Sequence, residues 1–178
     1  MTLNEGTHEL GPGDGRLLLT TSRSGLGRRA GHDLTIEATR WSATAVVGAE
    51  PGSSSVEVEV EVDGLEVREG TGGVLPLSDG DREEIGKNLR KVLQSGRHPT
   101  IVFRSTAVEG TAAAFTVTGE LTVAGRSGPL TVEAAESDGR LRGGATVRQS
   151  RWGVKPYSAF FGALKLADDV GVTFDLPA

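Results

Sequence analysis

The sequence contains no cysteine and few large side chains. Without cysteine, the chain cannot form a disulfide, a thiolate nucleophile or a cysteine-based metal site. Aromatic residues make up 4% and hydrophobic residues 37% of the 178 positions, so valine and alanine must supply most of the core. No apolar run approaches the roughly eighteen residues of a transmembrane helix. We therefore expect a soluble protein with no transmembrane segment.

Positive charge is also in short supply. The formal net charge is −5 and the isoelectric point is near 5.3, so no basic surface is expected for nucleic acid phosphates or an anionic membrane. We expect no nucleic acid partner. The first ten residues include Glu5 and Glu9 and lack the apolar segment of a secretion signal, which predicts a cytoplasmic location.

Apolar and polar residues alternate in several segments, as in half-buried strands. The clearest segment is 56–62, which places four valines on one strand face and three glutamates on the other. We interpret those glutamates as a solvated outer face. Similar alternation occurs at 34–38, 101–103, 115–123, 130–134, 141–147 and 170–176. Short glycine-rich turns separate these segments, which favours antiparallel neighbours.

One segment has helical spacing instead. Ile85, Leu89 and Leu93 recur at intervals typical of one helix face, which predicts a helix at about residues 81–94. Asp81 and Glu84 have the spacing of a capping box, and Gly96 is placed to end the helix.

The expected strands need a cover for their apolar faces. One helix cannot cover about eight strands in an open sheet, whereas closing the sheet buries the faces and removes the edges. We therefore predict an all-β fold: a closed antiparallel β-barrel of about eight strands with one α-helix, forming a single domain over residues 1–178.

Several stretches in this order resemble the YceI-like family, which is also described as polyisoprenoid-binding and lipocalin-like. They are Gly-His-Asp-Leu-Thr at 31–35, Gly-Val-Leu-Pro-Leu at 73–77, His-Pro-Thr-Ile-Val-Phe-Arg-Ser at 98–105, Gly-Glu-Leu-Thr-Val-Ala-Gly at 119–125, and the run 153–168. The resemblance spans nearly the whole chain. It implies a lipocalin-like barrel whose apolar cavity accepts a polyisoprenoid, a quinone, or a fatty amide or acid.

The apolar strand faces and the late aromatic residues are the candidate ligand-binding residues. Such a ligand needs an apolar pocket with few polar groups. The alternative is that these side chains only fill a small barrel, because protein interiors are normally close-packed. The predicted ligand-binding residues are Val58, Val60, Phe103, Phe115, Val117, Leu121, Trp152, Tyr157, Phe160 and Phe161.

Catalytic signals are weak. His32 and Asp33 could form a base, but adjacent strand residues point to opposite faces. His8 and His98 lack the spacing of a metal cluster, and no nucleophile elbow, phosphate-binding loop or zinc signature occurs. We expect no metal and no cofactor.

Three functions stay open at this point. The first is a non-enzymatic protein that binds an isoprenoid-like or fatty amphiphile. The second is an enzyme that uses the same cavity, with His32 or Tyr157 transferring a proton. The third is an interaction module with a filled core, and a homodimer is possible in either the first or the third case.

Overall fold

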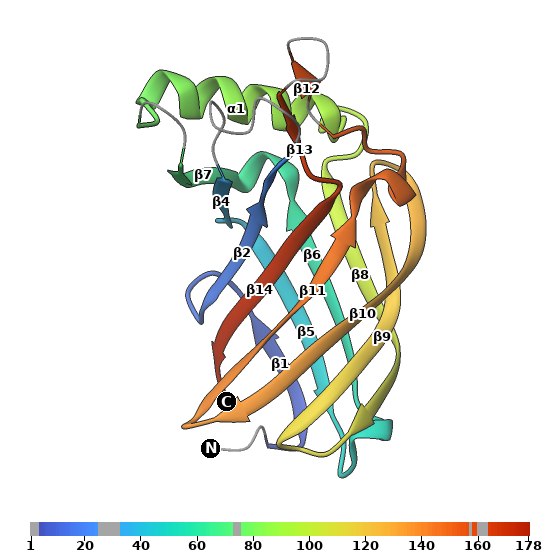
Figure 1. The fold of residues 1–178 in the computed structure, drawn as a ribbon. Helices are drawn as coiled ribbons and strands as arrows, with labels where there is room; N and C mark the ends of the chain where they lie inside the picture. Colours follow the sequence, from blue (N-terminus) through green and yellow to red (C-terminus); the bar gives the residue numbers. More distant parts are fainter. Residues whose placement is uncertain (1–3, 25–32, 73–75, 157, 160–163) are drawn as a thin grey trace.

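The computed structural model describes residues 4–24, 33–72, 76–156, 158–159 and 164–178 as a strongly curled sheet with one α-helix (Figure 1). The main sheet has eleven strands, in the order β1-β5-β6-β8-β9-β10-β11-β14-β2-β4-β7, and neighbouring strands pair antiparallel throughout. Its strands are β1 (Gly6–Leu10), β2 (Arg16–Thr21), β4 (Asp33–Ala38), β5 (Trp41–Val47), β6 (Ser55–Glu61), β7 (Leu65–Thr71), β8 (Thr100–Gly110), β9 (Ala114–Val123), β10 (Arg126–Ser137), β11 (Arg140–Arg148) and β14 (Asp169–Pro177).

Three short strands form a second sheet beside the helix. They are β3 (Arg23–Ser24), β12 (Ser158–Ala159) and β13 (Leu164–Leu166), in the order β12-β13-β3. Three 3-10 turns complete the described chain: η1 (Pro51–Ser53), η2 (Val62–Gly64) and η3 (Gln149–Trp152). No helix in the described ranges is long and apolar enough to cross a membrane.

The predicted all-β class, antiparallel pairing and single long helix are confirmed, but the prediction of a closed barrel of about eight strands is wrong. The sheet is an open half-barrel that ends at β1 and β7. The physical reason is a kink that crosses a long hairpin, where Thr39 N–H donates to the Gly64 carbonyl at 2.8 Å and Glu61 N–H donates to the Arg40 carbonyl at 3.0 Å. On one side of the kink β4 pairs with β7 and on the other β5 pairs with β6, and among the described residues no pairing between β1 and β7 closes the sheet.

The alternation seen in the sequence does place one strand face inside. In β4, every second residue from Leu34 to Ala38 is buried, and in β6 the glutamates are exposed while the valines are less exposed. On the outer face, Arg104 Nε donates to the Glu57 carboxylate at 2.9 Å, which raises the pKa of Arg104. The acidic outer face is therefore solvated and partly paired with arginine, as predicted.

A second outer ion pair carries a pH-dependent contribution to stability. The Glu37 carboxylate accepts hydrogen bonds from Arg68 Nε at 2.8 Å and from Arg16 Nη2 at 3.4 Å, and these bonds lower the pKa of Glu37. A carboxyl whose pKa is lower in the folded state stabilises the fold above its unfolded pKa. That contribution is lost as the pH falls through the folded pKa.

We therefore expect Glu37→Gln to lower the free energy of unfolding by about 0.5–1 kcal/mol at neutral pH. The difference from the wild type should shrink as the pH falls below about 4.3, the ordinary glutamate value. Urea unfolding at a series of pH values measures both, with Glu109→Gln, an exposed glutamate, as the control. Identical pH profiles for Glu37→Gln and the wild type would contradict this account.

The helix α1 spans Asp79–Val92 and lies across one end of the curled sheet, while both termini lie at the other end (Figure 1). Its start differs from the prediction, because Ser78 is the N-cap and Asp81 is the third helical residue. Ser78 Oγ accepts from Asp81 N–H at 3.1 Å, and the Asp81 carboxylate accepts from Ser78 N–H at 2.9 Å. The observed capping box is therefore formed by Ser78 and Asp81, with Ser78 directly before the first helical residue, and not by the predicted pair Asp81 and Glu84.

Loss of this cap should loosen the helix. We expect Ser78→Ala to lower the free energy of unfolding by about 1 kcal/mol, because two backbone N–H groups at the helix start lose their partner or its support. Ser78→Thr keeps the hydroxyl and is expected to retain most of the stability. Urea unfolding of the three proteins checks this, and equal stabilities of Ser78→Ala and wild type would count against the cap.

Candidate functional site

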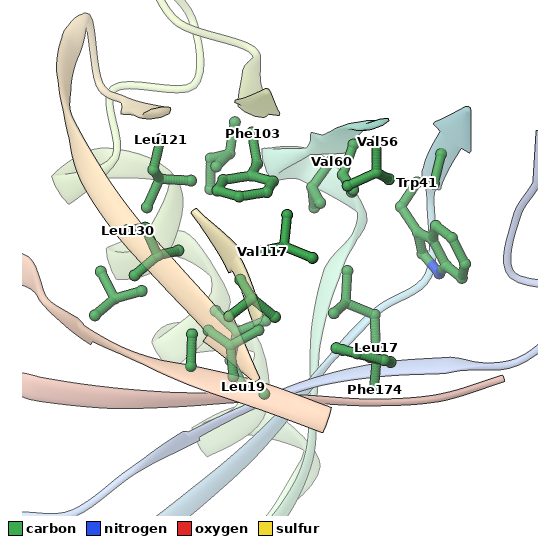
Figure 2. A pocket seen from close by; sticks show the side chains of 18 of the residues that line it. Leu17, Leu19, Trp41, Val56, Val60, Phe103, Val117, Leu121, Leu130 and Phe174 are labelled. Atoms are coloured by element: carbon green, nitrogen blue, oxygen red, sulfur yellow. The ribbon is translucent and has the colours of Figure 1, made fainter. Parts of the chain in front are cut away.

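A cavity of about 1140 Å³ lies inside the curl of the sheet and reaches α1. Figure 2 shows side chains from distant strands converging on this space, among them Trp41 from β5, Phe103 from β8, Val117 from β9 and Phe174 from β14. Most of the lining side chains are aliphatic or aromatic. The concave face of the half-barrel is therefore the apolar wall of a cavity, which favours a container over a core filled by its own side chains.

The size of the cavity decides how to interpret it. An enclosed empty cavity costs about 24 cal/mol per Å³, which for 1140 Å³ gives roughly 27 kcal/mol. That exceeds the roughly 5–15 kcal/mol of total stability of a typical domain. An empty cavity of this size would be too costly to keep, so we expect it to hold solvent or a bound molecule.

Two local features keep large side chains on the inner face. In β8 the pairing with β9 shifts between Ser105 and Ala107, so Val108 lies on the same inner face as Phe103 although the two are an odd number of residues apart. In β9, a Cβ at Gly119 would lie 2.6 Å from the Phe103 ring. The glycine thus leaves room for the Phe103 ring next to β9.

The cavity runs along the strands between two chemically different ends. We call the end beneath α1 the helix end and the opposite end, near the β5–β6 and β10–β11 turns, the turn end. The polar and charged lining residues at the helix end are Thr21, Arg23, Asp81, Glu84, Asn88, Gln149 and Lys155. Those at the turn end are Asn4, Glu5, Glu50, Ser54, Ser55 and Glu136. Between them the wall is almost wholly apolar.

The structure brings most of the predicted ligand-binding residues to this wall. Val58, Val60, Phe103, Phe115, Val117 and Leu121 all line the cavity. Contact of these residues with a ligand stays a prediction. Tyr157, Phe160 and Phe161 lie outside the described residues.

Trp152 is buried but does not line the cavity. Its Nε1–H donates to the Leu121 carbonyl at 2.8 Å, and a Cβ at Gly128 would lie 3.3 Å from its ring. The 3-10 turn η3 therefore places this indole over β9 and β10, where it serves packing. The sequence predicted an inward Trp152, but the ring packs beside the cavity rather than lining it.

Other lining residues were not among the predicted ones. Leu17 and Leu19 of β2 and Trp41 of β5 line the cavity, and α1 contributes Ile85 and Leu89. Three consecutive leucines in β2 obscure the alternation that would have selected Leu17 and Leu19. The helix residues followed a clear apolar spacing, but only the fold shows that they face a cavity rather than a packed core.

Of the candidate catalytic pair His32 and Asp33, the structure describes only Asp33, and that carboxylate is bound by Arg23. The Asp33 carboxylate accepts from Arg23 N–H at 2.8 Å and from Arg23 Nε at 3.1 Å. The backbone hydrogen bond, with the guanidinium, lowers the pKa of Asp33. His32 lies outside the described residues. Among the described residues no group of histidines and carboxylates is arranged to hold a metal ion.

Comparison with known proteins identifies the family. The chain is similar in structure to BcnA of Burkholderia cenocepacia, with a TM-score of 0.62, 16% identity and coverage of 91% of this chain and 96% of that one. It is also similar to the YCEI protein of Campylobacter jejuni, with a TM-score of 0.57, 15% identity and coverage of 80% and 82%. No curated protein matches the sequence. Because the model of the YceI-like domain matches residues 19–178, the chain belongs to the YceI-like family, as its sequence motifs predicted.

Proposed function

We propose that this protein is a non-enzymatic binding protein that holds an apolar, chain-like amphiphile inside the half-barrel. The observation that carries the proposal is the apolar cavity of about 1140 Å³. Burial of a methylene group contributes roughly 0.8 kcal/mol, so an apolar wall is sufficient to bind a long chain without many directional contacts. Membership of the YceI-like family supports a binding role in general.

The shape of the cavity favours a chain over a compact ligand. On β9 alone the lining residues extend from Phe115 to Val123, a span of roughly 27 Å at about 3.4 Å per residue. Lining residues from the helix end and the turn end belong to the same cavity. A polyisoprenoid, a quinone with an isoprenoid tail, or a fatty amide or acid fits this elongated space.

The proposal is tested by isothermal titration calorimetry with geranylgeraniol and myristyl alcohol, an isoprenoid and a saturated amphiphile. We expect saturable binding with a negative heat capacity change, which marks burial of apolar surface. The protein is first stripped of any copurified molecule by refolding from denaturant. If neither compound then binds, the proposal is overturned.

A cytoplasmic location, a single domain and pairing of two copies stay predictions.

A further inference from the structure

Charge is distributed unevenly around the cavity. The described lining residues include five acidic side chains and two basic ones, a formal balance of −3. The acidic residues are Glu5, Glu50, Asp81, Glu84 and Glu136, and the basic residues are Arg23 and Lys155. Of the two basic groups, Arg23 already forms an ion pair with Asp33 at 3.1 Å. The turn end holds three of the acidic residues and no basic one, whereas two acidic and two basic residues line the helix end.

The turn end is the less favourable place for an anion. All three charged lining residues there, Glu5, Glu50 and Glu136, are acidic. An anion removed from water needs a paired cation to offset its lost hydration. At the helix end, Lys155 is the cation left to supply that pairing among the described lining residues, and two carboxylates line the same end.

One uncharged polar side chain is placed differently. Asn88 lies on the cavity face of α1, between the lining residues Ile85 and Val92, and is half-buried. Its side-chain amide offers two donors and two acceptor lone pairs, and it forms no hydrogen bond with the described chain. Leucine would be the better helix former and would match the apolar wall. An amide here is the group whose hydrogen bonds a ligand could complete.

We propose that the cavity selects an amphiphile with an uncharged, oxygen-bearing head group, and that this head lies at the helix end against the Asn88 amide. The tail then extends along β9 toward the turn end. This inference rests on the proposed function, because it assigns the orientation and the head-group class of a ligand in the same cavity.

The experiment compares three probes with one shared tail: myristyl alcohol, myristamide and myristate, each titrated at neutral pH. We expect the alcohol and the amide to bind at least about tenfold more tightly than myristate, since a charged head gains no compensating cation. Asn88→Leu should weaken binding of the alcohol and the amide by about tenfold, the value of one well-formed hydrogen bond, and leave myristate unchanged.

Two control variants isolate the effect. Lys87→Leu introduces leucine on the exposed side of α1, where the residue does not line the cavity, and should leave all three affinities unchanged. Lys155→Gln should leave the order of the three probes unchanged. A direct readout is the NMR signal of the Asn88 side-chain amide, which should shift on addition of myristyl alcohol.

The outcomes separate this inference from the proposed function. If none of the three probes binds, the proposed function fails. If all three bind with equal affinity, or if Asn88→Leu alters none of them, the function stands and the head-group assignment is wrong. Tighter binding of myristate than of the alcohol would also overturn the assignment.

Discussion

Replacing Val117 with tryptophan should weaken binding of myristyl alcohol and geranylgeraniol at least tenfold. Val117 lies in the middle of the inner face, is 6% exposed, and pairs across the sheet with Val108 and Val132 (Figure 2). An indole at this position projects into the cavity and occupies the space that a chain would fill. Tenfold corresponds to about 1.4 kcal/mol, or fewer than two methylene groups displaced from the wall.

The matched control is Thr118→Trp, which adds the same ring to the exposed face of β9. Calorimetric titration and urea unfolding are measured on both variants. Val117→Trp should lower the free energy of unfolding by about 1–3 kcal/mol, because Val117 is packed among buried neighbours, and binding is compared where the variant is folded. Undiminished binding by a folded Val117→Trp protein would place the ligand outside the cavity.

Removal of the Trp152 side chain should have the opposite profile, with a large loss of stability and little loss of binding. Trp152 is 4% exposed, and its indole packs with Val154 and with inner residues of β8 and β9 in one cluster. Truncation of a buried tryptophan to alanine costs about 3–5 kcal/mol. Since Trp152 does not line the cavity, Trp152→Ala should bind myristyl alcohol within about threefold of the wild type where it remains folded.

Trp152→Phe is the milder variant should Trp152→Ala unfold. It keeps most of the packing and removes the 2.8 Å hydrogen bond to the Leu121 carbonyl, at an expected cost of about 1 kcal/mol. Urea unfolding and calorimetric titration measure the two properties separately. Loss of binding by Trp152→Phe at unchanged stability would show that Trp152 belongs to the ligand site after all.

The sequence predicted local structure well because period-two alternation reports burial one strand at a time. The buried positions of β4 and the inward valines of β6 follow directly from that pattern. Closure of the sheet is a different kind of property. Whether the sheet closes or stays open depends on the kink near Arg40 and Gly64, where backbone hydrogen bonds join two distant segments. Alternation within one strand carries no information about such a pairing.

The candidate site was predicted only in part, because alternation reports which strand residues point inward but not what they face. Inward residues of β6, β8 and β9 were recognisable, but hydrophobicity does not distinguish a side chain that lines a cavity from one that packs beside it, as Trp152 does. Asn88 was not recognised because a single amide on an amphipathic helix resembles solvated surface. Its meaning depends on α1 lying over the cavity (Figure 1).

The most direct test of the central claim is the identity of whatever the cavity holds in the cell. The wild-type protein and Val117→Trp are purified under native conditions, denatured and extracted with organic solvent, and the extracts are compared by mass spectrometry. We predict a near-stoichiometric, uncharged isoprenoid or fatty amphiphile from the wild type and a strongly reduced amount from the variant. Wild-type extracts without such a compound, even after incubation of the protein with a total lipid extract, would contradict the account.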